Sequence, residues 1–307
     1  MISICIPVFN YDVTLLVKDL SAQAVREGIP FEIRILDDCS DDFFRKINVS
    51  LQSVPGVVYR ESSVKLGRAA IRNKMAAESV YPYLLFMDCD SVIPDDQYLA
   101  RYLSFCRSSE VVVGGRCYQE QRPPAQFFLH WYYGVHREAR KAAERNKHPY
   151  RSFMTNNFLI PKKIFNAVPL DETLRQYGHE DTLMGYLLQK KGIPVIHIDN
   201  PLCHAGLETA EVFLSKTEKA LENLFVMGKK MNFPAGFVRE IRVLKAFSMV
   251  KKAGLQSFLA GSFCFCKKWM QKHLMGRHPS LFVLDLYKLG YLCEYAGKEI
   301  LCCPEQT

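Results

Sequence analysis

The chain has 307 residues, of which 49% are hydrophobic and 23% charged, with a formal net charge of +8 at pH 7, as in an ordinary globular protein with one large domain and an appendage. No secretory signal precedes the first strand-like run, and no apolar run approaches the roughly 20 residues that span a bilayer. The 11 cysteines are scattered without the spacing of a zinc site, so we expect reduced thiols in a cytoplasmic protein.

Strand-like and helical patterns alternate in the first part of the chain. In chain order, we predict a strand at 2–8, a helix near 13–27, strands at 31–36 and 57–59, a helix at 68–79 and a strand at 83–87. This alternation is typical of a mainly parallel sheet with helices on both faces. The carboxyl ends of such strands meet at one edge, where open α/β sheets bind their ligands.

Two carboxylates follow the apolar run at 83–87. Asp88 and Asp90 lie one residue apart, so an extended chain would point both to the same side. That arrangement suits a hard divalent cation that carries phosphate oxygens. A turn followed by a helix cap is the alternative, and the Asp-Cys-Asp triplet alone does not decide between them.

Other polar side chains are predicted at the same edge. Asp38 follows the second strand and could accept hydrogen bonds from a ribose or a base. Arg68 and Arg72 lie four residues apart on the helix after Gly67 and therefore share a face. They could grip a diphosphate, with Asn73 reaching a base or ribose, although a solvated helix face would have the same pattern.

Taken in order, these segments resemble the family 2 glycosyltransferases, which are inverting enzymes with the GT-A fold. The resemblance covers about residues 1–206 and rests on the motifs at 2–10, 37–40, 67–73 and 88–90. It implies an α/β GT-A catalytic domain at 1–207, followed by a basic helical region at 208–307. It also implies that these motifs bind a nucleotide-diphosphate sugar, with the DxD triplet engaging its metal.

The resemblance implies roles for individual residues. Substrate binding is implied for Pro7, Phe9, Asn10, Asp38, Gly67, Arg68, Arg72, Asn73, Asp88, Asn156, Asn157 and His179. The two asparagines, in a strand predicted at 152–161, stand where the family contacts donor and acceptor hydroxyls.

An acidic pair opens the next predicted helix. Glu180 and Asp181 lie in its first turn, where the helix dipole favours acidic residues and could explain one of them without a function. In the family this pair supplies the catalytic base. We assign that role to Asp181 and keep Glu180 as the alternative.

A divalent metal, Mn²⁺ or Mg²⁺, is the cofactor that the resemblance implies. Its expected ligands are Asp90 and His204, which follows a strand predicted at 194–199. Asp88 is also a candidate for the metal site, where it would contact the ribose or a metal-bound water.

The C-terminal part is predicted to be helical and basic. Helices are expected near 210–230, 235–251, 255–275 and 280–297, and residues 241–284 contain eight Lys and Arg but no Asp or Glu. Aromatic and apolar residues at helical spacing, with lysines near one end, make an anionic membrane surface one candidate partner of 255–277. Packing on the catalytic domain is the alternative, and nucleic acid is disfavoured because no binding motif accompanies the charge.

The resemblance therefore implies the transfer of a sugar from a nucleotide-diphosphate donor to an acceptor hydroxyl with inversion, and uridine diphosphate is the carrier that it implies. The Gln-x-x-Arg-Trp motif and membrane spans of processive polysaccharide synthases are missing, which indicates one addition per encounter. We expect a glycan or lipid-linked oligosaccharide acceptor, a role in polysaccharide biosynthesis, and a peripheral location at the inner face of the cytoplasmic membrane.

Two other functions remain open at this point. A nucleotidyltransferase would normally carry a Gly-rich, basic loop after the first strand, and residues 7–11 do not form one. A non-catalytic sugar-nucleotide-binding module would keep the fold without the chemistry, and the Glu180–Asp181 pair argues against it. A dinucleotide-dependent oxidoreductase is disfavoured because no Gly-x-Gly-x-x-Gly follows a strand.

Overall fold

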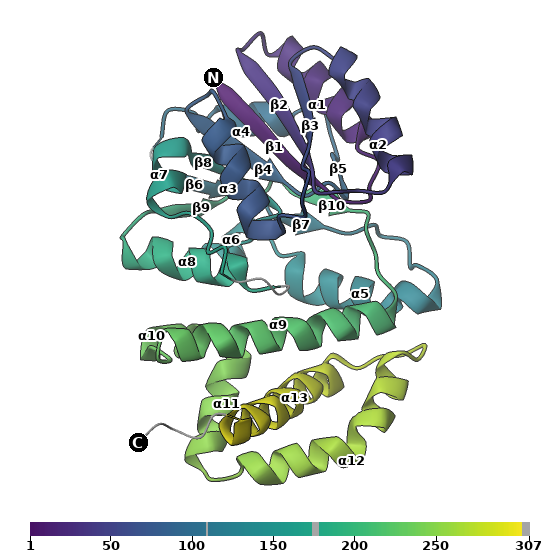
Figure 1. The fold of residues 1–307 in the computed structure, drawn as a ribbon, viewed down its shortest axis with the longest axis vertical. Coiled ribbons are helices and arrows are strands. Elements are labelled where there is room, and N and C mark those ends of the chain that lie inside the picture. Colours follow the sequence, from purple (N-terminus) through teal and green to yellow (C-terminus); the bar gives the residue numbers. More distant parts are fainter. Residues whose placement is uncertain (109, 174–177, 303–307) are drawn as a thin grey trace. The chain divides into compact units, whose positions relative to one another are not determined.

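The computed structural model describes residues 1–108, 110–173 and 178–302 (Figure 1). Its residues group into two compact units. The first comprises Met1–Glu120, Gly134–Arg175 and Glu180–Gly206, and the second comprises Gln121–Tyr133, Gln176–His179 and Leu207–Thr307.

A seven-stranded sheet forms the centre of the first unit. Its strands are β1 (Ile2–Val8), β2 (Phe31–Asp37), β3 (Val57–Glu61), β4 (Tyr83–Met87), β6 (Val111–Val113), β8 (Asn157–Pro161) and β9 (Val195–His197). They lie in the order β3-β2-β1-β4-β8-β6-β9. The first four are parallel, β6 and β9 pair in parallel, and β8 runs antiparallel to both of its neighbours. The predicted, mainly parallel sheet is therefore confirmed, with β8 as its reversed strand.

A small second sheet lies beyond the end of β4. It consists of β5 (Ser91–Val92), β10 (Leu202–His204) and β7 (Arg116–Cys117), in that order. In its antiparallel register, His204 pairs with Ser91, the residue that follows Asp90. Strand β7 pairs in parallel with β10 on the other side. This sheet thus brings two distant segments, β7 and β10, to the acidic triplet.

Helices cover both faces of the large sheet. They are α1 (Thr14–Arg26), α2 (Asp42–Asn48), α3 (Arg68–Glu78), α4 (Tyr98–Leu103), α6 (Ala142–Arg145), α7 (Lys162–Ala167) and α8 (Glu180–Lys190), with short turns η1 (Val49–Ser53) and η3 (Gly134–Glu138). Side chains of β4 alternate between two cores. Leu85 and Met87 pack with α1 and α4, whereas Leu84 and Phe86 pack with α3, α7 and α8. The apolar run at 83–87 is therefore buried on both faces, as its composition predicts.

The second unit is helical, as expected from the sequence. It contains η2 (Ala125–Phe127), α5 (Phe128–Tyr133), α9 (Ala210–Lys230), α10 (Ala235–Glu240), α11 (Arg242–Lys252), α12 (Gln256–Leu274) and α13 (Leu281–Cys302). The helix predicted at 235–251 is two helices, because Ile241 adopts an extended backbone between α10 and α11. Within the residues that the structure describes, no helix combines the length and the apolar character needed to cross a membrane.

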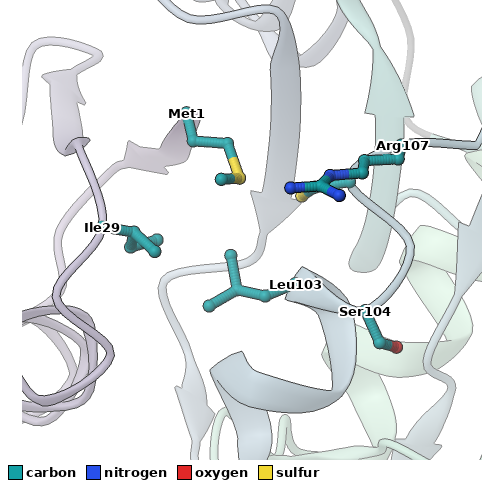
Figure 2. Close-up of a pocket in the computed structure, with 6 residues that line it drawn as sticks. Met1, Ile29, Leu103, Ser104 and Arg107 are labelled. Atoms are coloured by element: carbon teal, nitrogen blue, oxygen red, sulfur yellow. The ribbon is translucent and has the colours of Figure 1, made fainter.

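A cavity of about 300 Å³ lies at the amino-terminal edge of the large sheet (Figure 2). Met1, which lines it, directly precedes β1, and Ile29 lies two residues before β2. Leu103, Ser104, Cys106 and Arg107 complete its lining. This cavity is therefore at the opposite end of the strands from the acidic triplet.

Candidate active site

The ends of β1, β2 and β4 meet at one edge of the sheet, as predicted. Because β1 pairs in parallel with both β2 and β4, the residues that follow all three strands lie together. The Asp38 amide donates to the carbonyl of Val8 at 2.8 Å, which joins the ends of β1 and β2. The site is built on this edge.

Residues 7–10 lie at the end of β1. Pro7 is half-buried within the strand. The exposed Phe9 ring is covered by Lys65, whose Nζ lies 3.4 Å from the ring centroid. Asn10 has a φ of 50° and bonds to the following turn, accepting from the Asp41 amide at 2.7 Å and donating to its carboxylate at 3.0 Å. Phe9 is therefore the residue of this motif that presents a surface at the edge, whereas the Asn10 amide is used within the protein.

Asp38 holds the loop that leads into α3. Its buried carboxylate accepts hydrogen bonds from the amides of Leu66 at 2.6 Å and Gly67 at 3.0 Å. Gly67 has a φ of 81°, a conformation that favours glycine, and α3 begins at the next residue. The predicted nucleotide-binding residue thus has a local structural role as well, because it sets where α3 starts.

Asp88 forms ion pairs with two arginines. Arg72 Nη2 lies 2.6 Å from one carboxylate oxygen, and Arg116 Nη2 lies 3.4 Å from the other. Arg116 Nη1 also lies 3.2 Å from Glu138 Oε2, and the Tyr118 hydroxyl donates a hydrogen bond to that same Glu138 oxygen. Burial would lower the pKa of Arg116, but Glu138, Tyr118 and Asp88 outweigh it and raise that pKa, so the guanidinium stays charged.

Asp90 is enclosed by the segment that follows β10. Its carbonyl accepts from the Ala205 amide at 2.8 Å, and one carboxylate oxygen lies 3.5 Å from His204 Nδ1. A methyl group on Gly206 would lie 2.4 Å from that same oxygen, so only glycine fits against the carboxylate. The other oxygen, Oδ1, is buried without a hydrogen-bond partner. Asp90 therefore has an oxygen available for a ligand.

The charges around Asp90 keep it ionised. Burial alone would raise its pKa, but His204, Arg116 and Arg68 outweigh burial and lower the pKa to about 2. The Tyr118 ring packs edge-on against the His204 ring, with centroids 5.6 Å apart. An ionised carboxylate in a partly enclosed position suits Mn²⁺ or Mg²⁺, and an imidazole beside it is a better ligand for Mn²⁺ than for Mg²⁺, which prefers oxygen donors.

Asp181 lies in the first turn of α8, and the adjacent Glu180 is buried. Burial raises the pKa of the Asp181 carboxyl, opposed by hydrogen bonds from Thr182 and by the charge of Arg68, and aided by Glu138. Arg68 thus acts on both Asp181 and Asp90, which puts the two carboxylates in one electrostatic neighbourhood. His179, just before α8, has a φ of 70°.

Three predicted amides have different positions. Asn156 lies beside the triplet, since its carbonyl accepts from the Asp88 amide at 3.1 Å, and its side-chain Oδ1 is buried without a partner. Asn73 bonds instead to the backbone of Leu170 and to Glu172. The side chain of Asn73 is therefore held by hydrogen bonds within the protein.

Asn157 lies in the core beneath the site. Its Oδ1 accepts from the hydroxyls of Tyr98 and Tyr102, each at 2.7 Å. Its Nδ2 donates to the carbonyls of Gly115 at 2.9 Å and Asn200 at 2.8 Å. These contacts use both lone pairs and both hydrogens of the amide. The geometry supports a structural role for Asn157 in place of the expected substrate contact.

The residues present fit a divalent cation in part. Within the described ranges, no group of three or more His, Cys, Asp and Glu side chains is arranged to hold a metal. Asp90 and His204 form a pair, and the unpartnered, buried Oδ1 of Asp90 is the atom that a cation would satisfy. Asp88 forms ion pairs with two arginines, so it fits a metal site less well than Asp90 and His204 do.

Four residues of this site were missed by sequence reasoning: Arg116, Tyr118, Glu138 and Gly206. Arg116 comes shortly after the apolar strand β6, as Asp88 comes after β4, and this shared position after a buried strand could have indicated Arg116 as a site residue. Glu138 and Gly206 follow no motif, because only tertiary pairing brings them to the triplet.

Comparisons with known proteins agree with this architecture. The sequence model of glycosyl transferase family 2 matches residues 3–168, more than half of the chain. Among curated proteins, no sequence matches. The mannosyltransferase PcManGT from Pyrobaculum calidifontis, solved with GDP-Man and Mn²⁺, is similar in structure with a TM-score of 0.53 and 11% identity, over 99% of this chain and 88% of that one.

Two structures of TarS from S. aureus are also similar. TarS 1-349 in complex with UDP has a TM-score of 0.49 and 16% identity, over 97% of this chain and 91% of that one. A longer TarS chain has a TM-score of 0.48 and 16% identity over 71% of this chain. The match spans only 38% of the length of that TarS chain. With a family match over six of the seven strands of its large sheet and over the acidic triplet, and a fold shared with GT-A enzymes, the chain belongs to glycosyl transferase family 2 and is a glycosyltransferase.

Proposed function

We propose that this protein transfers a sugar from a nucleotide-diphosphate sugar, with uridine diphosphate as the carrier, to an acceptor hydroxyl with inversion at the anomeric carbon. The observation that carries the proposal is that Asp90 and Asp181, both of which feel the charge of Arg68, have pKa values shifted in opposite directions. Asp90 is kept ionised and has a buried, unpartnered oxygen. Asp181 has a raised pKa, as a base that must take up a proton requires.

The cation site of this proposal consists of Asp90 and His204, completed by the diphosphate of the donor. A bound Mn²⁺ or Mg²⁺ would supply charge neutralisation for the leaving diphosphate. Asp88 stands outside this ligand set because Arg72 and Arg116 neutralise it. The mannosyltransferase of similar fold was solved with GDP-Man and Mn²⁺, the same classes of donor and cation.

Asp181 is the proposed general base, with Glu180 as the alternative. The acceptor oxygen forms a bond to the anomeric carbon while the bond from that carbon to the diphosphate oxygen breaks. The diphosphate leaves with the bonding electrons, and Asp181 receives the proton of the acceptor hydroxyl. Arg68, exposed at the start of α3, stabilises the negative charge that grows on the diphosphate.

The acceptor of this proposal is a glycan or a lipid-linked oligosaccharide, to which one sugar is added per encounter in polysaccharide biosynthesis. The proposed location is peripheral, at the inner face of the cytoplasmic membrane. The basic, aromatic composition of residues 255–277 supports this location.

Nucleotide release tests the proposal. The full chain is incubated with UDP-sugars, Mn²⁺ and glycan acceptors, and UDP formation is measured. Asp181→Asn should abolish acceptor-dependent release while UDP binding, measured by calorimetry with Mn²⁺, stays unchanged. The matched control is Asp19→Asn on the exposed side of α1, which should leave turnover intact. Unchanged turnover in Asp181→Asn would exclude Asp181 as the base.

A further inference from the structure

Helix α12 has two apolar faces, of which one is covered. On its inner face, Phe263, Met270 and Leu274 are buried. The Phe263 ring packs edge-on against Tyr287 of α13, with centroids 5.2 Å apart, and a methyl group on Gly290 would clash with it. This inner face joins the two helices, which run beside one another in Figure 1.

The outer face of α12 exposes aromatic side chains. Phe258, Phe265 and Trp269 are 69%, 91% and 63% exposed. At 100° per residue they fall within about 40° of one another around the helix, roughly opposite the buried stripe. Large aromatic side chains gathered on one exposed face mark an interaction surface. A helix needs only one apolar face to pack on its own domain, so the second face calls for another partner.

Positive charge accompanies this outer face. Lys268 and Lys272 are exposed and lie on one flank of the aromatic stripe. Lys267, by contrast, pairs with Glu218 at 3.0 Å and belongs to the packed side. Residues 241–284 contain no acidic side chain, so neither lysine has a carboxylate nearby in the sequence that could neutralise it. The surface is therefore both apolar and cationic.

We propose that the outer face of α12, defined by Phe258, Phe265, Lys268, Trp269 and Lys272, docks on an anionic lipid bilayer. The rings enter the interfacial region, where Trp is favoured, and the lysines meet the phosphate groups of anionic lipids. The inference deepens the proposed peripheral location, on which it rests, by naming the surface and the lipid chemistry.

A second copy of the chain fits this surface less well. In a two-fold symmetric contact, each copy would present the same patch to its partner. Both copies would then bring Lys268 and Lys272 into one apolar contact, and the patch holds no carboxylate that could pair with these charges. An anionic bilayer satisfies both the rings and the charges, so charge complementarity favours the membrane.

Vesicle binding tests the docking surface without any turnover. The full chain carrying Trp131→Phe keeps Trp269 as its single tryptophan. We expect it to co-sediment with vesicles of phosphatidylcholine mixed with phosphatidylglycerol, with a blue shift of Trp269 fluorescence, and to bind pure phosphatidylcholine at least about tenfold more weakly. Phe258→Ser with Phe265→Ser, and separately Lys268→Glu with Lys272→Glu, should each weaken binding by at least about tenfold.

Matched controls lie in the first unit. Phe43→Ser removes a ring that is 67% exposed, and Lys18→Glu with Lys46→Glu makes the same charge change on exposed sides of α1 and α2. Equal binding by control and outer-face variants would overturn the proposal. So would the absence of binding to anionic vesicles, or a dimer that Phe265→Ser dissociates. Because donor and acceptor are absent, a failure of sugar transfer alone would count against the proposed function and not against this surface.

Discussion

Arg72 and Asp88 form a nearly buried ion pair that joins α3 to the end of β4, with 2.6 Å between the guanidinium and the carboxylate. Because Arg116 approaches the other oxygen of the same carboxylate, the protein itself neutralises the first aspartate of the triplet. Asp90, two residues later, keeps an oxygen without a partner. The two aspartates therefore have different roles, although the sequence pattern treats them alike.

Removing Arg72 should leave the Asp88 carboxylate with only its longer contact to Arg116. We expect Arg72→Met to lower the free energy of unfolding by about 3 kcal/mol, since breaking a buried ion pair strands a charge. Urea denaturation measures this change. The control is Arg60→Met on the exposed side of β3, which should change stability by less than about 0.5 kcal/mol. Equal effects of the two substitutions would contradict the role given to the pair.

A substitution at Gly206 tests whether the position of the Asp90 carboxylate matters for the binding of Mn²⁺. In Gly206→Ala the added methyl would lie 2.4 Å from Asp90 Oδ2, so the carboxylate must move. We expect the Mn²⁺ concentration for half-maximal nucleotide release to rise by about tenfold, as for other changes around a metal ligand. Gly297→Ala is the control, because its methyl would meet no atom closer than 3.9 Å. An unchanged Mn²⁺ requirement in Gly206→Ala would exclude Asp90 as the ligand.

The raised pKa of Asp181 sets the acid limb of the pH profile. A general base must be deprotonated, so transfer should fall as the pH drops through the folded-state pKa, which lies above that of an ordinary aspartate. The measurement is kcat/KM against pH with a saturating cation. If Glu180 were the base, Asp181→Asn would keep most of the activity and the acid limb would remain.

The same shift has a consequence for stability. Because the folded state raises the pKa of Asp181, its contribution to stability is fully present below the unfolded pKa and is lost as the pH rises through the folded pKa. At neutral pH the ionised carboxylate of Asp181, which is half-buried, therefore destabilises the folded state. We expect Asp181→Asn to be more stable than the parent at pH 7 and equal to it at low pH, as measured by Tm at both values. A less stable variant at pH 7 would contradict the burial of this charge.

Local patterns predicted the frame of the site because they depend on neighbours in sequence. The apolar run before Asp88, and the strand before Asp38, were enough to bring those carboxylates to one edge of a parallel sheet. The strand at β8 was predicted, but its reversed direction was not, because pairing with distant strands sets the direction. The three short strands at the triplet were not predicted either, since two or three residues carry no periodic signal. Arg116 and Glu138 enter the site only through that long-range pairing.

Polar residues were the hardest to assign, because a side chain that binds a substrate and one that holds the fold look alike in sequence. Asn156 and Asn157 are adjacent and chemically identical. The structure separates them by the number of hydrogen bonds that the protein already supplies: Asn157 has partners for all four, whereas Asn156 Oδ1 has none.

This difference between the two asparagines can be measured. Asn157→Leu leaves the hydroxyls of Tyr98 and Tyr102, both fully buried, without their acceptor, and should lower the free energy of unfolding by about 3 kcal/mol or more. Asn156→Ala removes an amide whose Oδ1 has no partner, so it should change stability by about 1 kcal/mol or less. Its expected effect is on UDP affinity, measured by calorimetry with Mn²⁺. If Asn157→Leu instead weakened UDP binding with no loss of stability, Asn157 would be a substrate contact and its core network would not hold the fold.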